Sequence, residues 1–131
     1  MKILITNNPM ANQKHFDATE KIFLEAAGVL NVLYLVRDKI HEGHKLLTHP
    51  LSGSVKPNQT PYKSIMITKG KGQLDFESLR LIEDSIAVAK SLENSMPPAK
   101  TPEGGRMPAQ AFLEDFQLID LSLIESGLTI G

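Results

Sequence analysis

The chain has 131 residues, of which 41% are apolar and 22% are charged, a composition typical of one globular domain with a single hydrophobic core. The absence of cysteine excludes disulfides, thiolate nucleophiles and cysteine-based metal or iron–sulfur sites. No apolar run approaches the roughly 20 residues of a membrane span. The N-terminal apolar run is too short for a secretory signal, so we expect a cytoplasmic protein with no membrane partner.

The net charge of −1 hides an asymmetry along the chain. Residues 43–74 contain five lysines and no acid, whereas the rest of the chain has a net charge of −6. This asymmetry favours an anionic ligand near the middle of the sequence, although solvated lysines in a chance acid-free segment give the same pattern. Aromatic residues make up only 5% and tryptophan is absent, so nucleic acid is not expected as a partner.

The first 36 residues predict a strand, a helix and a second strand. Residues 2–6 form an apolar strand that ends before Asn7-Asn8-Pro9. Residues 13–27 carry an apolar stripe at helical spacing, and Gly28 stands where a helix C-terminal glycine belongs. Residues 31–36 are rich in strand-forming side chains. This order predicts a βαβ unit with parallel strands.

Residues 37–48 allow two interpretations. Either one helix covers residues 37–47, or a helix over residues 37–42 ends at Gly43 and residues 45–48 form a third strand. We favour the second, because glycine inside a helix costs about 1 kcal/mol relative to alanine. If that strand is parallel, the residues after it lie at the same sheet edge as Asn7 and Asn8, where open α/β sheets bind ligands. With one long helix, the loop starts from the opposite edge.

The second half predicts one more strand and two helices. Residues 64–68 are an apolar strand, and Asp75 can cap a helix that extends to about residue 92. Residues 94–108 contain four prolines and two glycines and predict a linker or flap. Residues 109–127 predict mostly helix, with a strand over residues 116–119 as the competing interpretation. We therefore expect one α/β domain over residues 1–131, a three-layer, Rossmann-like arrangement with a small, mainly parallel sheet.

Several polar residues are candidates for contacts with an anion. Two turns after predicted strands, residues 6–9 and residues 69–72, can present backbone N–H groups and side-chain donors, although Gly70 and Gly72 also fit as ordinary turn glycines. The long loop after residue 48 adds hydroxyl, ammonium and imidazole groups, and it also fits a surface loop held by its prolines. The predicted ligand contacts are Asn7, Asn8, His49, Ser52, Gly53, Ser54 and Lys56.

Other chemistries find little support in the sequence. His41, His44 and His49 do not form an HExxH pattern, and no other ligand set completes a metal site, so no metal is expected. No Gly-x-Ser-x-Gly motif indicates a serine hydrolase. His49 has a side chain suited to a general base, but no partner nucleophile is identifiable. We expect no cofactor and favour a protein that is not an enzyme, while catalysis stays open.

The segments HKLLTHPLSGSVKPNQTPYKSI, ITNNP and DFQLIDLSLI give the chain a resemblance to the GrdX family. Proteins of this family are encoded beside the glycine, sarcosine or betaine reductase genes of amino-acid-fermenting anaerobes. The resemblance implies an accessory role near a system that uses selenol and thiol chemistry and produces acetyl phosphate. It implies no catalytic residues, and a chain without cysteine cannot carry electrons or acyl groups through sulfur.

Two functions follow as hypotheses. In the first, the protein binds a small metabolite that carries a phosphate or a carboxylate, with the contacts named above. In the second, it is an interaction, assembly or regulatory factor for the reductase complex, because the predicted helix after Asp75 has a wide apolar face and residues 109–127 are apolar on several faces. The reductase subunits are then its partners, and self-association stays open.

Overall fold

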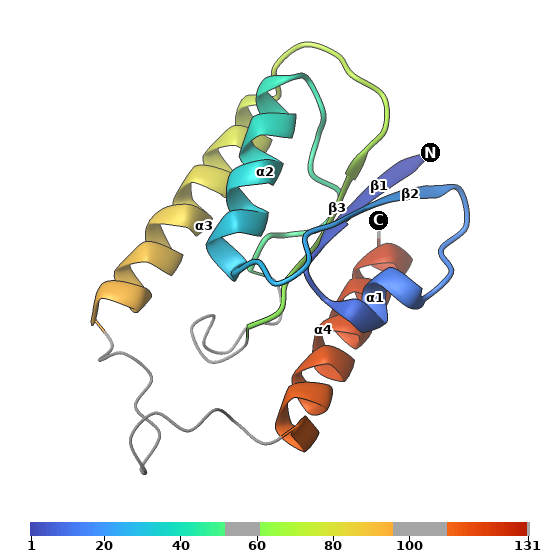
Figure 1. Cartoon of the computed structure of the whole chain (residues 1–131). Coiled ribbons are helices and arrows are strands. Elements are labelled where there is room, and N and C mark those ends of the chain that lie inside the picture. Colours follow the sequence, from blue (N-terminus) through green and yellow to red (C-terminus); the bar gives the residue numbers. More distant parts are fainter. Residues whose placement is uncertain (52–60, 96–109, 131) are drawn as a thin grey trace.

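The computed structural model describes residues 1–51, 61–95 and 110–130, which form a small sheet flanked by helices (Figure 1). In chain order, the elements are β1 Lys2–Thr6, α1 Pro9–Gln13, β2 Thr19–Phe23, α2 Val29–His41, β3 Ser64–Thr68, α3 Phe76–Ser95 and α4 Gln110–Ile130. The α/β class predicted from the sequence is confirmed. In the part of the chain that the structure describes, no helix is long and apolar enough to cross a membrane.

The sheet is mixed, with β1 at its centre and the strand order β2-β1-β3. β2 runs parallel to β1 and β3 runs antiparallel to it, so that Ile5 of β1 lies between Ile22 and Ile65. The prediction of a mainly parallel sheet is therefore wrong, and three strands do not establish a Rossmann-like, three-layer arrangement. β3 is antiparallel because it begins, at Ser64, beside the edge where β1 ends at Thr6.

The predicted βαβ unit exists, but its helix and second strand lie elsewhere. A helix over residues 13–27 is wrong, because Ala18 and Ala26 have φ angles of 52° and 58°, and these turns bracket strand β2. A strand over residues 31–36 is also wrong, because these residues lie inside α2, where Val32 and Val36 are buried one helical turn apart. Gly28 is the N-cap of α2 rather than a C-terminal glycine.

Helix α2 ends before Gly43, as the favoured interpretation predicts. Gly43 has a φ of 112°, and a Cβ atom there would lie 2.4 Å from the carbonyl oxygen of Gly72. Only glycine fits this conformation and this close approach. The predicted strand over residues 45–48 is reduced to one antiparallel bridge between Leu46 and Ile67 of β3. Since β3 is antiparallel to β1, the bridged segment runs parallel to β1 and heads toward the edge where β1 ends.

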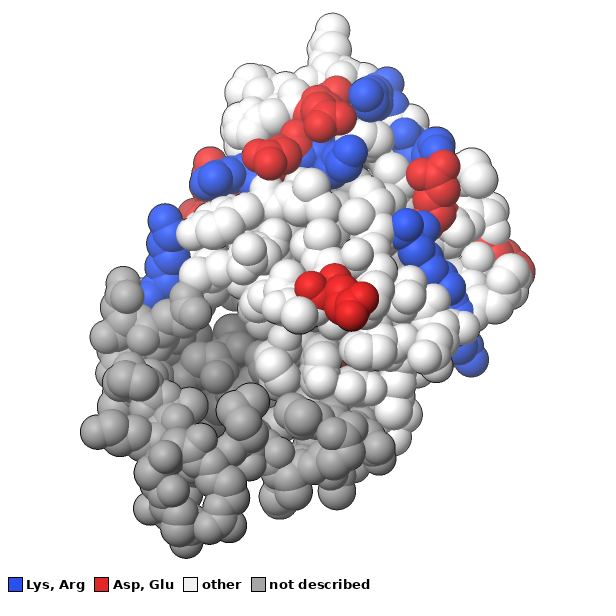
Figure 2. Space-filling model, in the orientation of Figure 1, with Lys and Arg blue, Asp and Glu red and all other residues white. Residues whose placement is uncertain are grey.

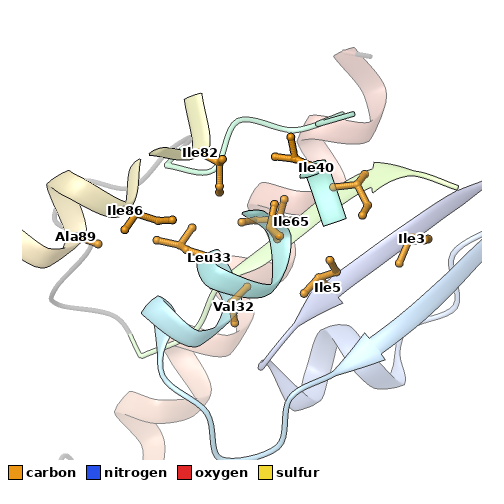
Figure 3. Packing of buried hydrophobic residues seen from close by; sticks show 11 residues of the cluster. Ile3, Ile5, Val32, Leu33, Ile40, Ile65, Ile82, Ile86 and Ala89 are labelled. Atoms are coloured by element: carbon orange, nitrogen blue, oxygen red, sulfur yellow. The ribbon is translucent and has the colours of Figure 1, made fainter. Parts of the chain in front are cut away.

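One face of the sheet carries the main hydrophobic core. Odd-numbered residues of β1 and β3 point toward α2 and α3, because side chains alternate along a strand. Figure 3 shows Ile3, Ile5 and Ile65 facing the buried side chains of these two helices. The buried cluster consists of Ile3, Ile5, Val32, Leu33, Val36, Ile40, Ile65, Ile67, Ile82, Ile86 and Ala89.

The opposite face is covered by α1 and α4, which lie side by side in Figure 1. Its apolar cluster is smaller and consists of Leu4, Ala11, Phe16, Met66 and Ile124. The strand residues on this face have even numbers, and the next even positions toward the edge are Thr6 and Ser64, both buried. The sequence therefore places polar side chains under α4 where the apolar cluster stops.

Three predictions about the second half are confirmed, and one lies mainly outside the described residues. Strand β3 has the predicted bounds, and the Asp75 carboxylate accepts a hydrogen bond from the Ser78 backbone N–H at 3.0 Å, capping α3. The C-terminal segment is helical throughout residues 110–130, so the competing strand is wrong. Of the predicted flap, residues 94–95 belong to the end of α3 and residues 96–108 lie outside the described part of the chain.

Candidate functional site

A cluster of buried polar side chains lies where β1 ends and β3 begins, and part of it contacts α4. We call it the polar cluster, and its members are Thr6, Asn7, Asn8, Lys63, Ser64, Gln117 and Asp120. Each is at most 9% exposed. Because a buried polar group without a hydrogen-bond partner is costly, each member has to be accounted for.

Asp120 of α4 is the centre of the cluster. Its carboxylate accepts hydrogen bonds from the Ser64 backbone N–H at 3.1 Å and from the Ser64 hydroxyl at 2.5 Å. It also accepts a hydrogen bond from the Asn8 side-chain amide at 2.9 Å. The Ser64 hydroxyl lies 2.7 Å from that of Thr6, so α4 is bound to both strands through this one acid. Three donors stabilise the buried carboxylate and fix the position of α4 over the sheet.

Asn8 joins α1 to α4. Its side-chain oxygen accepts a hydrogen bond from the Met10 N–H and caps α1, with Pro9 at the first helical position. Its side-chain amide donates to the Gln117 carbonyl oxygen at 2.8 Å and to Asp120. Both ends of the amide are therefore engaged within the protein.

Asn7 holds together two segments that enter the sheet edge from different directions. Its side-chain oxygen accepts a hydrogen bond from the Lys63 backbone N–H at 2.8 Å. Its amide donates to the carbonyl oxygens of Ala27 and Pro61, each at 2.8 Å. Asn7 thus fixes the chain just before α2 and just before β3. Direct contact of Asn7 or Asn8 with a ligand stays a prediction.

Lys63 differs from the rest of the cluster. It is 5% exposed, and within the described part of the chain no hydrogen bond or ion pair of its ammonium group is found. Burial lowers the pKa of Lys63 below its ordinary value near 10.5, and the negative charge of Asp120 acts in the opposite direction and more weakly. Asp120 therefore acts electrostatically on Lys63 but does not form an ion pair with it. The ammonium is a buried positive charge with incomplete compensation.

The other described lysines of the acid-free segment lie near acids from elsewhere in the chain. Lys69 forms an ion pair with Glu20, and Lys71 lies 3.6 Å from Glu42. Lys45 is exposed and acts electrostatically on Asp75. Figure 2 shows Lys and Arg side chains next to Asp and Glu side chains along the upper rim of the molecule. The excess positive charge read from the sequence is thus largely neutralised on the surface, and Lys63 is the buried exception among these four lysines.

The remaining predicted contacts are only partly visible. His49 is exposed, and its ring nitrogen Nδ1 accepts a hydrogen bond from the Leu51 N–H at 3.1 Å, which forms a local turn. Ser52, Gly53, Ser54 and Lys56 lie outside the described residues. The structure therefore brings Asn7 and Asn8 into one cluster, and no described hydrogen bond joins His49 to it. Ligand binding by these residues stays a prediction.

His44 and the glycine turn after β3 have structural roles. His44 is buried, and its Nδ1 lies 2.7 Å from the Thr68 carbonyl oxygen, which ties the end of α2 to β3. In the turn after β3, the Gly72 N–H donates to the Gly43 carbonyl oxygen at 3.0 Å. Among the described residues, no group of three or more histidine or acidic side chains is arranged to hold a metal ion.

Lys63, Ser64, Gln117 and Asp120 are not among the site residues that the sequence predicts. Lys63 belongs to the acid-free segment, but its charge alone does not distinguish it from the exposed lysines of that segment. Asp120 carries a recognisable signal, because it is a single acid between Ile119 and Leu121 in an apolar helix. A lone charged residue inside an otherwise apolar helical stretch indicates a buried polar contact.

Comparison with protein families identifies the chain. The profile of the family described as GrdX-like protein matches residues 3–129, so the chain belongs to the GrdX-like protein family. Searches among curated proteins and among solved structures found no match.

Proposed function

We propose that this member of the GrdX-like family is a cytoplasmic accessory protein of a glycine reductase system and that it binds a small anionic metabolite. The chain belongs to the GrdX-like protein family. Its resemblance to GrdX proteins, which are encoded beside reductase genes, supports the proposed link to the reductase. The single observation that favours an anion is the buried ammonium of Lys63, which has no ion-pair partner among the described residues. No reaction is assigned to the protein.

The charge of Lys63 makes an anion the favoured ligand. At an effective dielectric constant of about 20, two opposite charges about 4 Å apart attract each other by roughly 4 kcal/mol. Asp120 does not supply this attraction at close range, because its oxygens are held by Ser64 and Asn8 and form no ion pair with Lys63. A phosphate or carboxylate beside Lys63 would supply it and would also accept the N–H bonds of the ammonium.

The ligand contacts predicted from the sequence complete the proposal. Residues 45–48 run toward the edge where β1 ends, and the hydroxyl-rich loop begins after them. We propose that His49, Ser52, Gly53, Ser54 and Lys56 face the same anion as Lys63. Asn7 and Asn8 then act mainly by fixing the backbone of this edge, because their side-chain amides already form hydrogen bonds within the protein. Asn7 accepts one from the Lys63 backbone N–H, and Asn8 donates one to the Gln117 carbonyl oxygen.

Calorimetric titration tests this function. Inorganic phosphate, acetyl phosphate and glycine are titrated into the wild-type protein, into Lys63→Met and into the control Lys71→Met, whose lysine is exposed and lies near Glu42. We expect at least one anion to bind the wild type and the control equally. We expect Lys63→Met to lose about tenfold or more in affinity, equivalent to about 1.4 kcal/mol.

Two results contradict the proposal. One is the absence of binding heat for every anion at millimolar concentrations, and the other is equal affinity in the wild type and Lys63→Met. Ser54→Ala and Lys56→Met separate the contacts of the loop from that of Lys63. If both variants bind like the wild type, the anion site is restricted to the polar cluster.

Exposed apolar side chains favour a second candidate, an interaction or assembly factor for the reductase complex. Leu118 and Ile119 of α4 are 55% and 56% exposed, and they lie on the side of the helix away from the buried Gln117 and Asp120. Adjacent exposed apolar residues are more often found at protein contacts than single ones. In this candidate, α4 binds a reductase subunit and no small ligand is needed.

A pull-down with purified reductase subunits tests the second candidate. Leu118→Glu and Ile119→Glu remove the apolar contact without touching the polar cluster, and Leu47→Glu is the control on another exposed apolar side chain. We expect the two α4 variants to lose the partner and the control to keep it. Recovery of no subunit by the wild type, together with a monomeric mass in light scattering, contradicts this candidate.

A further inference from the structure

The ammonium group of Lys63 has three hydrogen-bond donors, and the described residues supply no acceptor to any of them. Lys21 shows the contrast, because its ammonium donates to the carbonyl oxygens of Asn12 and Lys14. Lys63 is also 5% exposed, so bulk water does not replace the missing acceptors. Burying an ammonium group, which is strongly hydrated in water, costs free energy when its N–H donors have no acceptors. A reaction that removes N–H donors but keeps the positive charge lowers this cost.

We propose that Lys63 forms a reversible imine with a small carbonyl compound that also carries an acid group, such as a short 2-oxo acid. The inference rests on the proposed function, since the acid group is the anion and the carbonyl is the additional feature. Lysine residues desolvated in a protein interior are the ones that form such adducts, because the neutral amine is the nucleophile.

The reaction balances without any further reactant. The Lys63 ammonium gives up one proton, and the amine nitrogen attacks the carbonyl carbon to give a carbinolamine. The proton and the hydroxyl group then leave as water, and a protonated imine remains. The charge is +1 before and after, and no electrons are exchanged. Three N–H donors are replaced by one, which suits a site that offers the ammonium no acceptor.

Asp120 of α4 is the charged group that acts on Lys63 in the described structure. Its carboxylate is held by Ser64 and Asn8, so it remains a fixed negative charge that acts on Lys63 without contacting its ammonium group. A protonated imine is a positive charge of the same sign as the ammonium, and the field of Asp120 therefore stabilises it. Asp120 is a positioning residue here, because it forms no ion pair with Lys63.

Burial affects both the reactivity of the Lys63 amine and the size of the carbonyl compounds that can reach it. Burial lowers the pKa of Lys63, so a larger fraction of this amine is neutral at about pH 7 than at an exposed lysine, about tenfold more for each unit of lowering. The same burial restricts access, which favours molecules of two or three carbons over larger aldehydes. The combination predicts selective labelling of Lys63 by small carbonyl acids.

Reductive trapping on the full-length protein tests the inference. Glyoxylate and acetaldehyde, which has the carbonyl but no acid group, are added separately with cyanoborohydride at about pH 7, and adducts are located by peptide mass mapping. Lys71 is the internal exposed reference. We expect glyoxylate to label Lys63 about tenfold or more faster than Lys71. We also expect Lys63→Arg and Lys63→Met to lose this adduct while keeping the wild-type circular dichroism spectrum.

The outcomes separate the imine from the anion site. Equal labelling of Lys63 by glyoxylate and acetaldehyde contradicts both the proposed anion site and the proposed need for an acid group on the carbonyl compound. Calorimetric binding of phosphate and glyoxylate without an adduct at Lys63 supports the anion site and overturns the imine. Adducts confined to exposed lysines overturn the imine as well. If Lys63→Arg does not fold, Lys63→Met alone provides the comparison.

Discussion

The two faces of the sheet are held by different forces. Beneath α2 and α3, eleven buried apolar side chains form one continuous cluster, and the strands contribute four isoleucines to it. Beneath α1 and α4, the buried apolar cluster has five members, and the sheet edge is bound to α4 by hydrogen bonds that converge on Asp120. Apolar burial is non-directional, whereas each of these hydrogen bonds fixes a distance and an angle.

The difference indicates what each face does. The apolar face supplies most of the stability, because a large contiguous apolar area leaves water there. The polar face supplies position, because Asp120, Ser64 and Asn8 fix α4 relative to β1 and β3. The buried ammonium of Lys63, at the sheet edge where β3 begins, is expected to lower stability. A feature that a protein keeps at a cost to its stability is a candidate for function.

The largest loss of stability is expected from the apolar face. Leu33→Ala removes a fully buried side chain and leaves a cavity between α2 and α3, which should lower the free energy of unfolding by about 2–5 kcal/mol. Urea unfolding measures this loss, and Leu47→Ala, at a partly exposed position, is the control with an expected change within about 0.5 kcal/mol. Similar losses in the two variants contradict the assignment of the core.

A smaller and more local loss is expected from the polar face. Asp120→Asn replaces a charged acceptor by an amide and leaves the Ser64 N–H or hydroxyl poorly paired, a loss of about 2–3 kcal/mol. Hydrogen exchange should become faster in α4 and stay unchanged in α2. Glu125→Gln is the control on the same helix, because its ion pair with Lys14 is exposed at 3.6 Å and contributes about 0.5 kcal/mol or less. Uniform acceleration across all helices contradicts a local role of Asp120.

Lys63→Met is expected to increase stability, by about 1–2 kcal/mol at about pH 7, because it removes an uncompensated buried charge. The folded-state pKa of Lys63 is lowered, so the unfolded chain binds more protons between that pKa and the ordinary value near 10.5. Wild-type stability from this group therefore rises with pH in that interval, and the advantage of Lys63→Met shrinks. Urea unfolding at several pH values measures the trend.

The control for the lysine substitution is Lys71→Met, at an exposed position. The difference in free energy of unfolding between Lys71→Met and the wild type should stay constant as the pH rises, whereas that of Lys63→Met should shrink. A constant advantage of Lys63→Met from neutral pH to about pH 10 would show that the lysine is not desolvated.

The smallest effect is expected at the cap of α3, remote from both faces of the comparison. Hydrogen bonds from the Ser78 hydroxyl and N–H lower the pKa of Asp75, so its contribution to stability is present above the ordinary pKa of an aspartate and is lost as the pH falls. The free energy of unfolding should therefore fall slightly less between neutral and acidic pH in Asp75→Asn than in the wild type. Asp84→Asn, the control, should show the same fall as the wild type. An identical acid dependence in the wild type and Asp75→Asn contradicts the cap.

The parts of the fold that local signals encode could be predicted from the sequence. Strands β1 and β3, the Asp75 cap and the C-terminal helix depend on short apolar runs, a capping residue and helical spacing. The region between residues 13 and 36 could not be predicted, because Val32 and Val36 are strand formers placed by burial in a helix. The direction of β3 also depends on how the chain returns to the sheet, which local sequence does not encode.

The site shows the same limit. The acid-free segment correctly pointed to positive charge, but surface acids such as Glu20 and Glu42, remote in sequence, pair with Lys69 and Lys71. Only the tertiary structure separates the buried Lys63 from these exposed lysines. Asn7 and Asn8 were correctly placed at the sheet edge, yet their partners Ala27, Pro61 and Gln117 lie far away in the chain.

The central claim, that Lys63 is a buried cation able to receive an anion, is tested most directly by its own titration. The pKa of Lys63 can be followed by NMR of the labelled side chain, with and without inorganic phosphate or acetate. We predict a pKa below the ordinary value near 10.5 in the free protein and a higher pKa when an anion binds, because the anion stabilises the protonated form. A pKa at the ordinary value, or a lowered pKa that neither anion changes, contradicts the claim.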